Sequence, residues 1–159
     1  MCAQSNLYSG HLSQLASQGY IVFAIDHNDR SCQYTQLKKG SPISFDTSLP
    51  LYHKERRQEQ LKTRVQEVRE LVDEIYGEDF MRENGFKGVK LDHKRMTVSG
   101  HSFGGITAIT CAQTDQRFKA CLPMDPWLFP NIFDWSTKEY VMPPTLIIKT
   151  ATFEDGCLK

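Results

Sequence analysis

The sequence predicts an α/β fold in which a mostly parallel sheet is flanked by helices. Apolar runs typical of buried strands alternate with segments of helical period, and two of these runs enclose a helix at the spacing of a strand–helix–strand unit. A glycine-rich turn joins the first of these strands to its helix. Ligands of parallel sheets bind beyond the carboxyl ends of the strands, so we expect functional residues at that edge.

The first half of the chain is expected to hold a helix, a strand, a long loop and a second helix. Residues 10–19 have a short helical pattern closed by a glycine, and the β-branched and aromatic run 20–25 follows directly. Residues 32–53 contain glycine and two prolines without a sustained period, which is typical of a loop. Residues 54–76 predict the strongest helix, because apolar side chains recur at helical spacing, at Leu61, Val65, Val68, Leu71, Val72 and Ile75.

The second half predicts three further strands and one helix. We expect strands at 95–99 and 118–122, with a helix over 104–113 between them, and another buried strand at 144–151. Since no linker or internal repeat interrupts the pattern, residues 1–159 are predicted to form a single domain.

The turn after the 95–99 strand has the pattern Gly-x-Ser-x-Gly, from Gly100 to Gly104. A serine at such a strand-to-helix elbow sits in a cramped backbone conformation, which glycines two residues away on both sides would relieve. The elbow exposes the hydroxyl of Ser102 and directs the amide of Phe103 towards a developing oxyanion. A glycine-rich turn without chemistry and a phosphate loop are the alternatives, but neither nucleotide-binding glycine motif is present.

Asp125 is the candidate acid for such a serine. It lies 23 residues after Ser102, at the end of the next predicted strand, and a right-handed crossover places both residues on one edge of the sheet. A turn-forming role is the alternative for a lone aspartate. The apolar residues that follow are open to two interpretations, core packing and substrate lining; they are Trp127, Leu128, Phe129, Ile132, Phe133 and Trp135.

Two motifs together resemble those of a known family. Gly-His-Ser-Phe-Gly-Gly over 100–105 and Asp-Pro-Trp-Leu-Phe-Pro over 125–130 are similar to the elbow and acid segments of the platelet-activating-factor acetylhydrolases, in their plasma and intracellular type II branch, which includes lipoprotein-associated phospholipase A2. The likeness extends to residues 17–31 and 57–64, and therefore covers most of the chain.

The resemblance implies an α/β-hydrolase fold and hydrolysis of acetyl or short acyl esters at the sn-2 position of phospholipids, without a cofactor or metal. It implies Ser102 as the nucleophile, Asp125 as the acid, the Phe103 amide as an oxyanion donor and Trp127 as a wall of the acyl pocket. The implied partner is a phospholipid, at a membrane or lipid-particle surface. Alternatives are a carboxylesterase or thioesterase for a soluble ester, and a non-catalytic lipid-binding pseudoenzyme.

Two features depart from the family pattern. Pro123 stands where a strand should deliver Asp125, and since proline lacks a ladder donor we expect that strand to be at an edge, bulged or shortened. All five histidines (His11, His27, His53, His93 and His101) precede Ser102, whereas the base of this fold class follows the acid. Since the first strands and the oxyanion turn of the family also precede the matched region, we expect a chain truncated at both ends and inactive by itself, in which His101 is a poor base.

Composition excludes several other classes. The 19 basic and 19 acidic residues balance, so nothing favours a nucleic-acid partner. Five cysteines without a Cys-x-x-Cys pair indicate reduced thiols. No apolar run approaches the roughly 20 residues of a membrane-spanning helix, and no leader is recognisable, which predicts a cytoplasmic protein. A metal site in the loop 26–31 is disfavoured, because Asp26, His27 and Asp29 have no further cluster of ligands beside them. We expect a loop held by hydrogen bonds instead.

Overall fold

The computed structural model describes residues 5–37, 39–48, 50–131 and 141–151. The chain forms two compact units, Met1–His53 and Lys54–Lys159. No helix among the described residues is long and apolar enough to cross a membrane.

The first unit holds two short helices and a small hairpin. A 3-10 turn, η1 (Ser5–Tyr8), leads into α1 (Ser9–Ser17), close to the helix expected at 10–19. Within the expected loop, β1 (Tyr34–Thr35) pairs antiparallel with β2 (Ile43–Ser44), an element too short to leave a periodic signal in the sequence.

The prediction of a strand at 20–25 is wrong, because these residues form no strand in the described structure. The run leaves α1 with the Tyr20 amide bonded to the Leu15 carbonyl and then continues without regular structure. A β-branched, aromatic run has the side chains of a strand, but a strand also needs a neighbouring backbone to pair with, and the local sequence does not encode that neighbour.

The second unit is the α/β part of the chain. It runs through α2 (Lys54–Ile75), α3 (Glu78–Glu83), the 3-10 turn η2 (His93–Arg95), β3 (Thr97–His101), α4 (Phe103–Thr114) and β4 (Ala120–Met124). β3 and β4 pair in parallel, from Thr97 opposite Ala120 to His101 opposite Met124. Each predicted element from 54 to 122 is therefore confirmed, with strand bounds two residues later than expected, while α3 was not expected.

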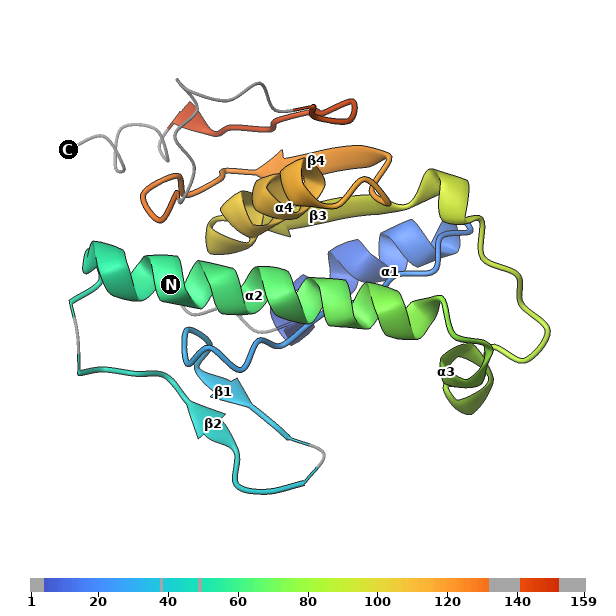
Figure 1. Ribbon diagram of the computed structural model, residues 1–159, viewed down its shortest axis with the longest axis horizontal. Coiled ribbons are helices and arrows are strands. Elements are labelled where there is room, and N and C mark those ends of the chain that lie inside the picture. Colours follow the sequence, from blue (N-terminus) through green and yellow to red (C-terminus); the bar gives the residue numbers. More distant parts are fainter. Residues whose placement is uncertain (1–4, 38, 49, 132–140, 152–159) are drawn as a thin grey trace. The chain divides into compact units, whose positions relative to one another are not determined.

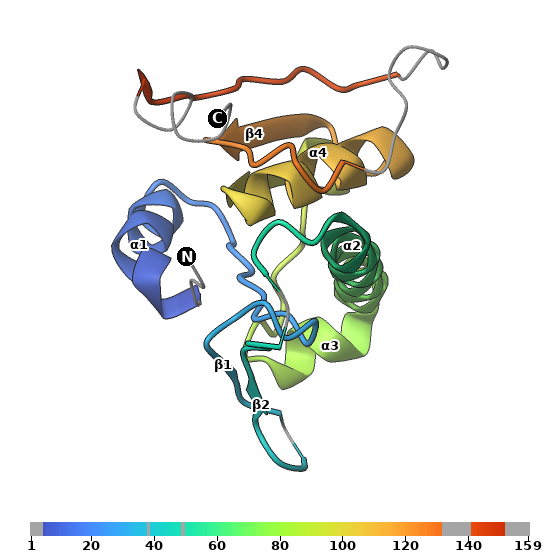
Figure 2. The same ribbon diagram turned by 90° about the vertical axis from the view of Figure 1, so that its left-hand side faces the viewer.

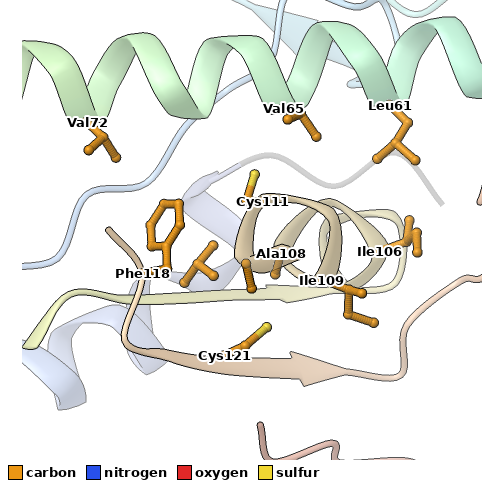
Figure 3. Packing of buried hydrophobic residues seen from close by; sticks show 11 residues of the cluster. Leu61, Val65, Val72, Ile106, Ala108, Ile109, Cys111, Phe118 and Cys121 are labelled. Atoms are coloured by element: carbon orange, nitrogen blue, oxygen red, sulfur yellow. The ribbon is translucent and has the colours of Figure 1, made fainter. Parts of the chain in front are cut away.

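α4 lies between the parallel strands and α2, as Figures 1 and 2 show. The apolar stripe of α2 faces α4, and Figure 3 shows Leu61, Val65 and Val72 directed towards it. α4 is buried along most of its length, including Ile106 and Cys111, neither of which is exposed at all. A helix buried on all sides needs apolar or small residues throughout, which explains its run of Ile, Thr and Ala.

Arg117 ties α2 to the end of α4. Its guanidinium donates to both carboxylate oxygens of Asp115, at 2.6–3.0 Å, and also pairs with Asp73 on α2. The hydrogen bonds from Arg117 lower the pKa of the Asp115 carboxyl, although burial opposes this. The pair fixes the turn that leads from α4 into β4.

The cysteines in the described part of the chain are buried: Cys32, Cys111 and Cys121. Burial raises the pKa of the Cys111 thiol to about 12 and that of Cys121 to about 11. The thiols of Cys111 and Cys121 are therefore protonated at neutral pH and pack in the hydrophobic core.

The buried strand expected at 144–151 is wrong: the segment is exposed, Leu146 by 64%, and it forms no regular strand, although residues 144–148 run parallel to β4. The amides of Leu146 and Ile148 donate to the carbonyls of Cys121 and Pro123, each at 3.0 Å. In this register the nitrogen at position 123 should donate to the Leu146 carbonyl, but proline has no N–H. The contact is thus reduced to two isolated bridges, Cys121 with Thr145 and Met124 with Ile148.

β4 itself is neither bulged nor shortened at Pro123. Its pairing with β3 is continuous over five residues, and Gly100 stands opposite Pro123. The nitrogen of Pro123 faces segment 144–148 and has no N–H. The proline therefore removes one hydrogen bond to that segment and leaves the pairing of β4 with β3 intact.

Candidate active site

Ser102 occupies the sharp turn between β3 and α4. Its backbone has φ 56° and ψ −115°, a region that residues with a side chain rarely adopt. The turn is bonded on both sides: the Ser102 amide donates to the Met124 carbonyl at 3.0 Å, and the Ser102 carbonyl accepts from the Trp127 amide at 2.9 Å. In the described part of the chain, the Ser102 side chain makes no capping hydrogen bond to the first turn of α4.

The glycines of the elbow have different structural reasons. A Cβ at Gly100 would lie 2.2 Å from the carbonyl oxygen of Gly104, so no side chain fits there. A Cβ at Gly105 would lie 2.7 Å from the Cα of Pro126. A Cβ at Gly104 would meet nothing within 4 Å. The expectation that both flanking glycines relieve a clash is therefore correct for Gly100 and wrong for Gly104, where a methyl group would point into open space.

Asp125 directly follows β4 and lies on the same edge of the sheet as Ser102, as the crossover argument predicted. It also has a positive φ, 42°. Its carboxylate accepts hydrogen bonds from the backbone amide of Thr150 at 2.6 Å and from the Thr150 hydroxyl at 3.1 Å. The carboxylate is thus ordered and its side chain only 13% exposed.

Phe103 is the first residue of α4, so its amide has no acceptor within the helix. Its ring lies under the guanidinium of Arg64, 4.2 Å from ring centroid to carbon, and meets Trp127 edge-on at 5.5 Å. Arg64 belongs to α2 and is buried. The residue that carries the candidate oxyanion donor is therefore anchored from both sides, and the role of Arg64 was not foreseen from the sequence.

Trp127 is 8% exposed and packed between two aromatic rings. It stacks on Phe129 with ring centroids 5.5 Å apart, and it meets Phe103 on another side. Leu128, which lies between Trp127 and Phe129 in the sequence, is exposed. Ile132, Phe133 and Trp135, the other members of the predicted apolar cluster, lie outside the described residues.

Two histidines belong to the same unit as Ser102. His93 stacks on Tyr76 with centroids 4.0 Å apart. His101 directs its Nε2 towards Asp125, 3.9 Å from Oδ2. The remaining three belong to the unit Met1–His53.

The polar loop of the first unit is held by its own hydrogen bonds. Asp26 accepts from the amide and hydroxyl of Ser5, and Asp29 accepts from the amide and hydroxyl of Ser31. Within the described ranges no group of three or more His, Cys, Asp or Glu side chains is placed to hold a metal ion.

The chain is similar in sequence to known proteins along most of its length. The family model described as platelet-activating factor acetylhydrolase, isoform II, matches residues 1–156. The platelet-activating factor acetylhydrolase of Cavia porcellus is 30% identical over 95% of this chain, and that of Bos taurus is 31% identical over 78%. Hydrolase phmG of Phaeosphaeria nodorum is 45% identical over 51 residues, 32% of this chain and 11% of its own length. The chain spans 38% and 32% of the lengths of the first two relatives.

Proposed function

The chain belongs to the platelet-activating factor acetylhydrolase, isoform II, family of hydrolases, and we propose that it supplies the nucleophile and the acid of a serine esterase with the α/β-hydrolase fold. The observation that carries the proposal is the strained elbow at Ser102, bonded to the segment that begins with Asp125. A backbone held at φ 56° costs stability, and such strain persists mainly where function requires it.

The proposed reaction is acyl transfer through Ser102. Its oxygen attacks the ester carbonyl carbon while a base takes the hydroxyl proton, and the Phe103 amide stabilises the oxyanion that forms. Collapse of this intermediate expels the alcohol, which receives the proton from the base. Water then attacks the acyl-serine in the same way and releases the acid. Asp125 orients the base and stabilises its charged form.

The substrate we propose is the sn-2 acetyl or short acyl ester of platelet-activating factor and related phospholipids, taken from a membrane or lipid-particle surface. The support is the name shared by relatives that align with most of this chain. Trp127, packed against Phe103, is the proposed wall of the acyl pocket, because its ring lies beside the residue that carries the oxyanion donor.

A non-catalytic, lipid-binding role is the second candidate, and one observation favours it. No histidine follows Asp125 in the 159 residues, whereas the base of this fold class follows the acid in the chain order. Without a base the hydroxyl keeps its proton at neutral pH. We accordingly propose that the 159 residues alone turn over esters negligibly.

Free imidazole distinguishes the two candidates. Hydrolysis of platelet-activating factor and of p-nitrophenyl acetate is measured with increasing imidazole for the parent chain and for Ser102→Ala, whose rate is subtracted as the uncatalysed reaction. The esterase proposal expects imidazole-dependent turnover in the parent only, and faster deacetylation of the phospholipid than of the aryl ester. Equal rates in the parent and Ser102→Ala would leave the lipid-binding candidate, whereas robust turnover without imidazole would place the base within these residues.

A further inference from the structure

The carboxylate of Asp125 accepts hydrogen bonds from Thr150, 25 residues further along the chain. Thr150 donates its backbone N–H to Oδ1 at 2.6 Å, and its hydroxyl lies 3.1 Å from both Oδ1 and Oδ2. Two donors on one residue fix both the position of the carboxylate and its rotation about the Cβ–Cγ bond. Hydrogen bonds to an ionised acceptor are about twice as strong as neutral ones.

The backbone of the same segment delivers Thr150 to this position. The Asp125 amide donates to the Ile148 carbonyl at 2.7 Å, which continues the parallel pairing of 144–148 with β4 past the gap at Pro123. Thr150 therefore stands at the carboxyl end of the third parallel segment, next to the end of β4. The bond through Ile148 and the bonds through Thr150 close a small ring around Asp125.

This arrangement leaves one side of the carboxylate for another donor. The Thr150 amide occupies Oδ1, while Oδ2 faces the His101 ring at 3.9 Å, longer than a hydrogen bond. A carboxylate oxygen accepts more than one hydrogen bond, so Oδ2 has capacity for the N–H of an imidazole base.

We propose that Thr150 is the positioning residue for the catalytic acid, a role that rests on the proposed esterase function. Its hydroxyl holds the Asp125 carboxylate in the rotation that presents Oδ2 to the base, and its amide supplies the permanent charge-assisted bond. Because Thr150 is exposed, replacing it creates no cavity, and its substitutions act through the carboxylate.

The test compares three variants of the chain. Thr150→Val keeps the shape and removes the hydroxyl, and Thr150→Ser restores the hydroxyl. Thr145→Val is the matched control, since Thr145 lies on the same exposed segment but bonds to the Pro143 carbonyl at 2.8 Å, away from Asp125. For each, kcat and KM for p-nitrophenyl acetate are measured at saturating imidazole, together with the amide proton shift at position 150 by NMR, with and without Asp125→Asn.

Thr150→Val is expected to lower kcat about ten- to hundred-fold with KM within two-fold, the effect of losing one hydrogen bond to a charged acceptor. Thr150→Ser and Thr145→Val should retain the parent kcat. An unchanged kcat in Thr150→Val, or an equal loss in Thr145→Val, overturns the proposal. If the parent itself shows no serine-dependent turnover, the esterase function fails, and the NMR measurement then decides the contact: a Thr150 amide shift that is indifferent to Asp125→Asn shows that the contact is absent.

Discussion

The backbone amide of Trp127 donates a hydrogen bond to the carbonyl oxygen of Ser102 over 2.9 Å. The Ser102 amide in turn donates to the Met124 carbonyl. Both backbone polar groups of the strained residue therefore bond to the segment 124–127, which carries Asp125. The turn at Ser102 and the segment 124–127 are therefore joined by hydrogen bonds, and a substitution that displaces one of them should also displace the other.

Gly100→Ala should destabilise the chain strongly, whereas Gly104→Ala should not. The new methyl carbon at Gly100 would overlap the Gly104 carbonyl oxygen at 2.2 Å, and backbone atoms cannot withdraw as a flexible side chain can. We expect a loss of about 3 kcal/mol in the free energy of unfolding, measured by urea titration. At Gly104 the methyl group meets nothing, and alanine favours helix by about 1 kcal/mol, so that variant should match or exceed the parent. Equal losses in the two variants would contradict this account of the elbow.

The elbow also shows what the sequence could predict. A motif of five residues placed Ser102 between a strand and a helix, because glycine spacing and hydrophobic period are local signals. The handedness of the strand–helix–strand crossover placed Asp125 at the end of the neighbouring strand. Thr150 and Arg64 were missed, since their roles depend on contacts across 25 and 39 residues, respectively, that no local pattern encodes. One signal for Thr150 was available. It lies near the carboxyl end of the predicted 144–151 strand, and in a parallel sheet that end falls on the same edge as Ser102 and Asp125.

Ser102→Gly should raise the free energy of unfolding relative to Ser102→Ala. Both variants lack the hydroxyl, but alanine keeps the unfavourable φ of 56° and glycine adopts it without steric cost. The relief of strain is about 1–3 kcal/mol, and the greater entropy of the unfolded glycine chain offsets about 0.5–1 kcal/mol of it. A net gain of about 1 kcal/mol is expected in paired urea titrations. If the alanine variant is the more stable of the two, the backbone at position 102 is not strained in solution.

Asp115→Asn should destabilise the chain at neutral pH and become harmless in acid. The Arg117 hydrogen bonds lower the pKa of Asp115 in the folded chain, so the folded state holds its proton less tightly than the unfolded state. The stabilisation is present above the unfolded pKa of about 4 and disappears as the pH falls through the lower folded value. We expect a loss of about 1.5–3 kcal/mol in the variant at pH 7, and convergence with the parent as the pH falls below the folded pKa.

Asp79→Asn is the control for the Asp115 prediction. Its partner Arg82 forms an i,i+3 pair in which both side chains are more than half exposed, so removing it should cost under about 1 kcal/mol at any pH. Urea titrations from pH 7 to pH 2 compare the two variants with the parent. A difference between Asp115→Asn and the parent that stays constant over this range would show that ionisation of Asp115 does not contribute.

Pro123→Val should add the one hydrogen bond that the outer side of β4 lacks. The register set by Cys121 and Ile148 places the nitrogen of position 123 opposite the Leu146 carbonyl, and valine restores its N–H. The new bond contributes about 1 kcal/mol, but losing proline raises the entropy of the unfolded chain by nearly the same amount, so the free energy of unfolding should change little. Hydrogen exchange is therefore the decisive measurement: the new amide at position 123 should exchange slowly, like that of Leu146. The Ile147 amide, which alternation of the strand turns away from β4, is the rapidly exchanging reference. Fast exchange at position 123, with Leu146 still protected, would show that segment 144–148 does not hold this register in solution.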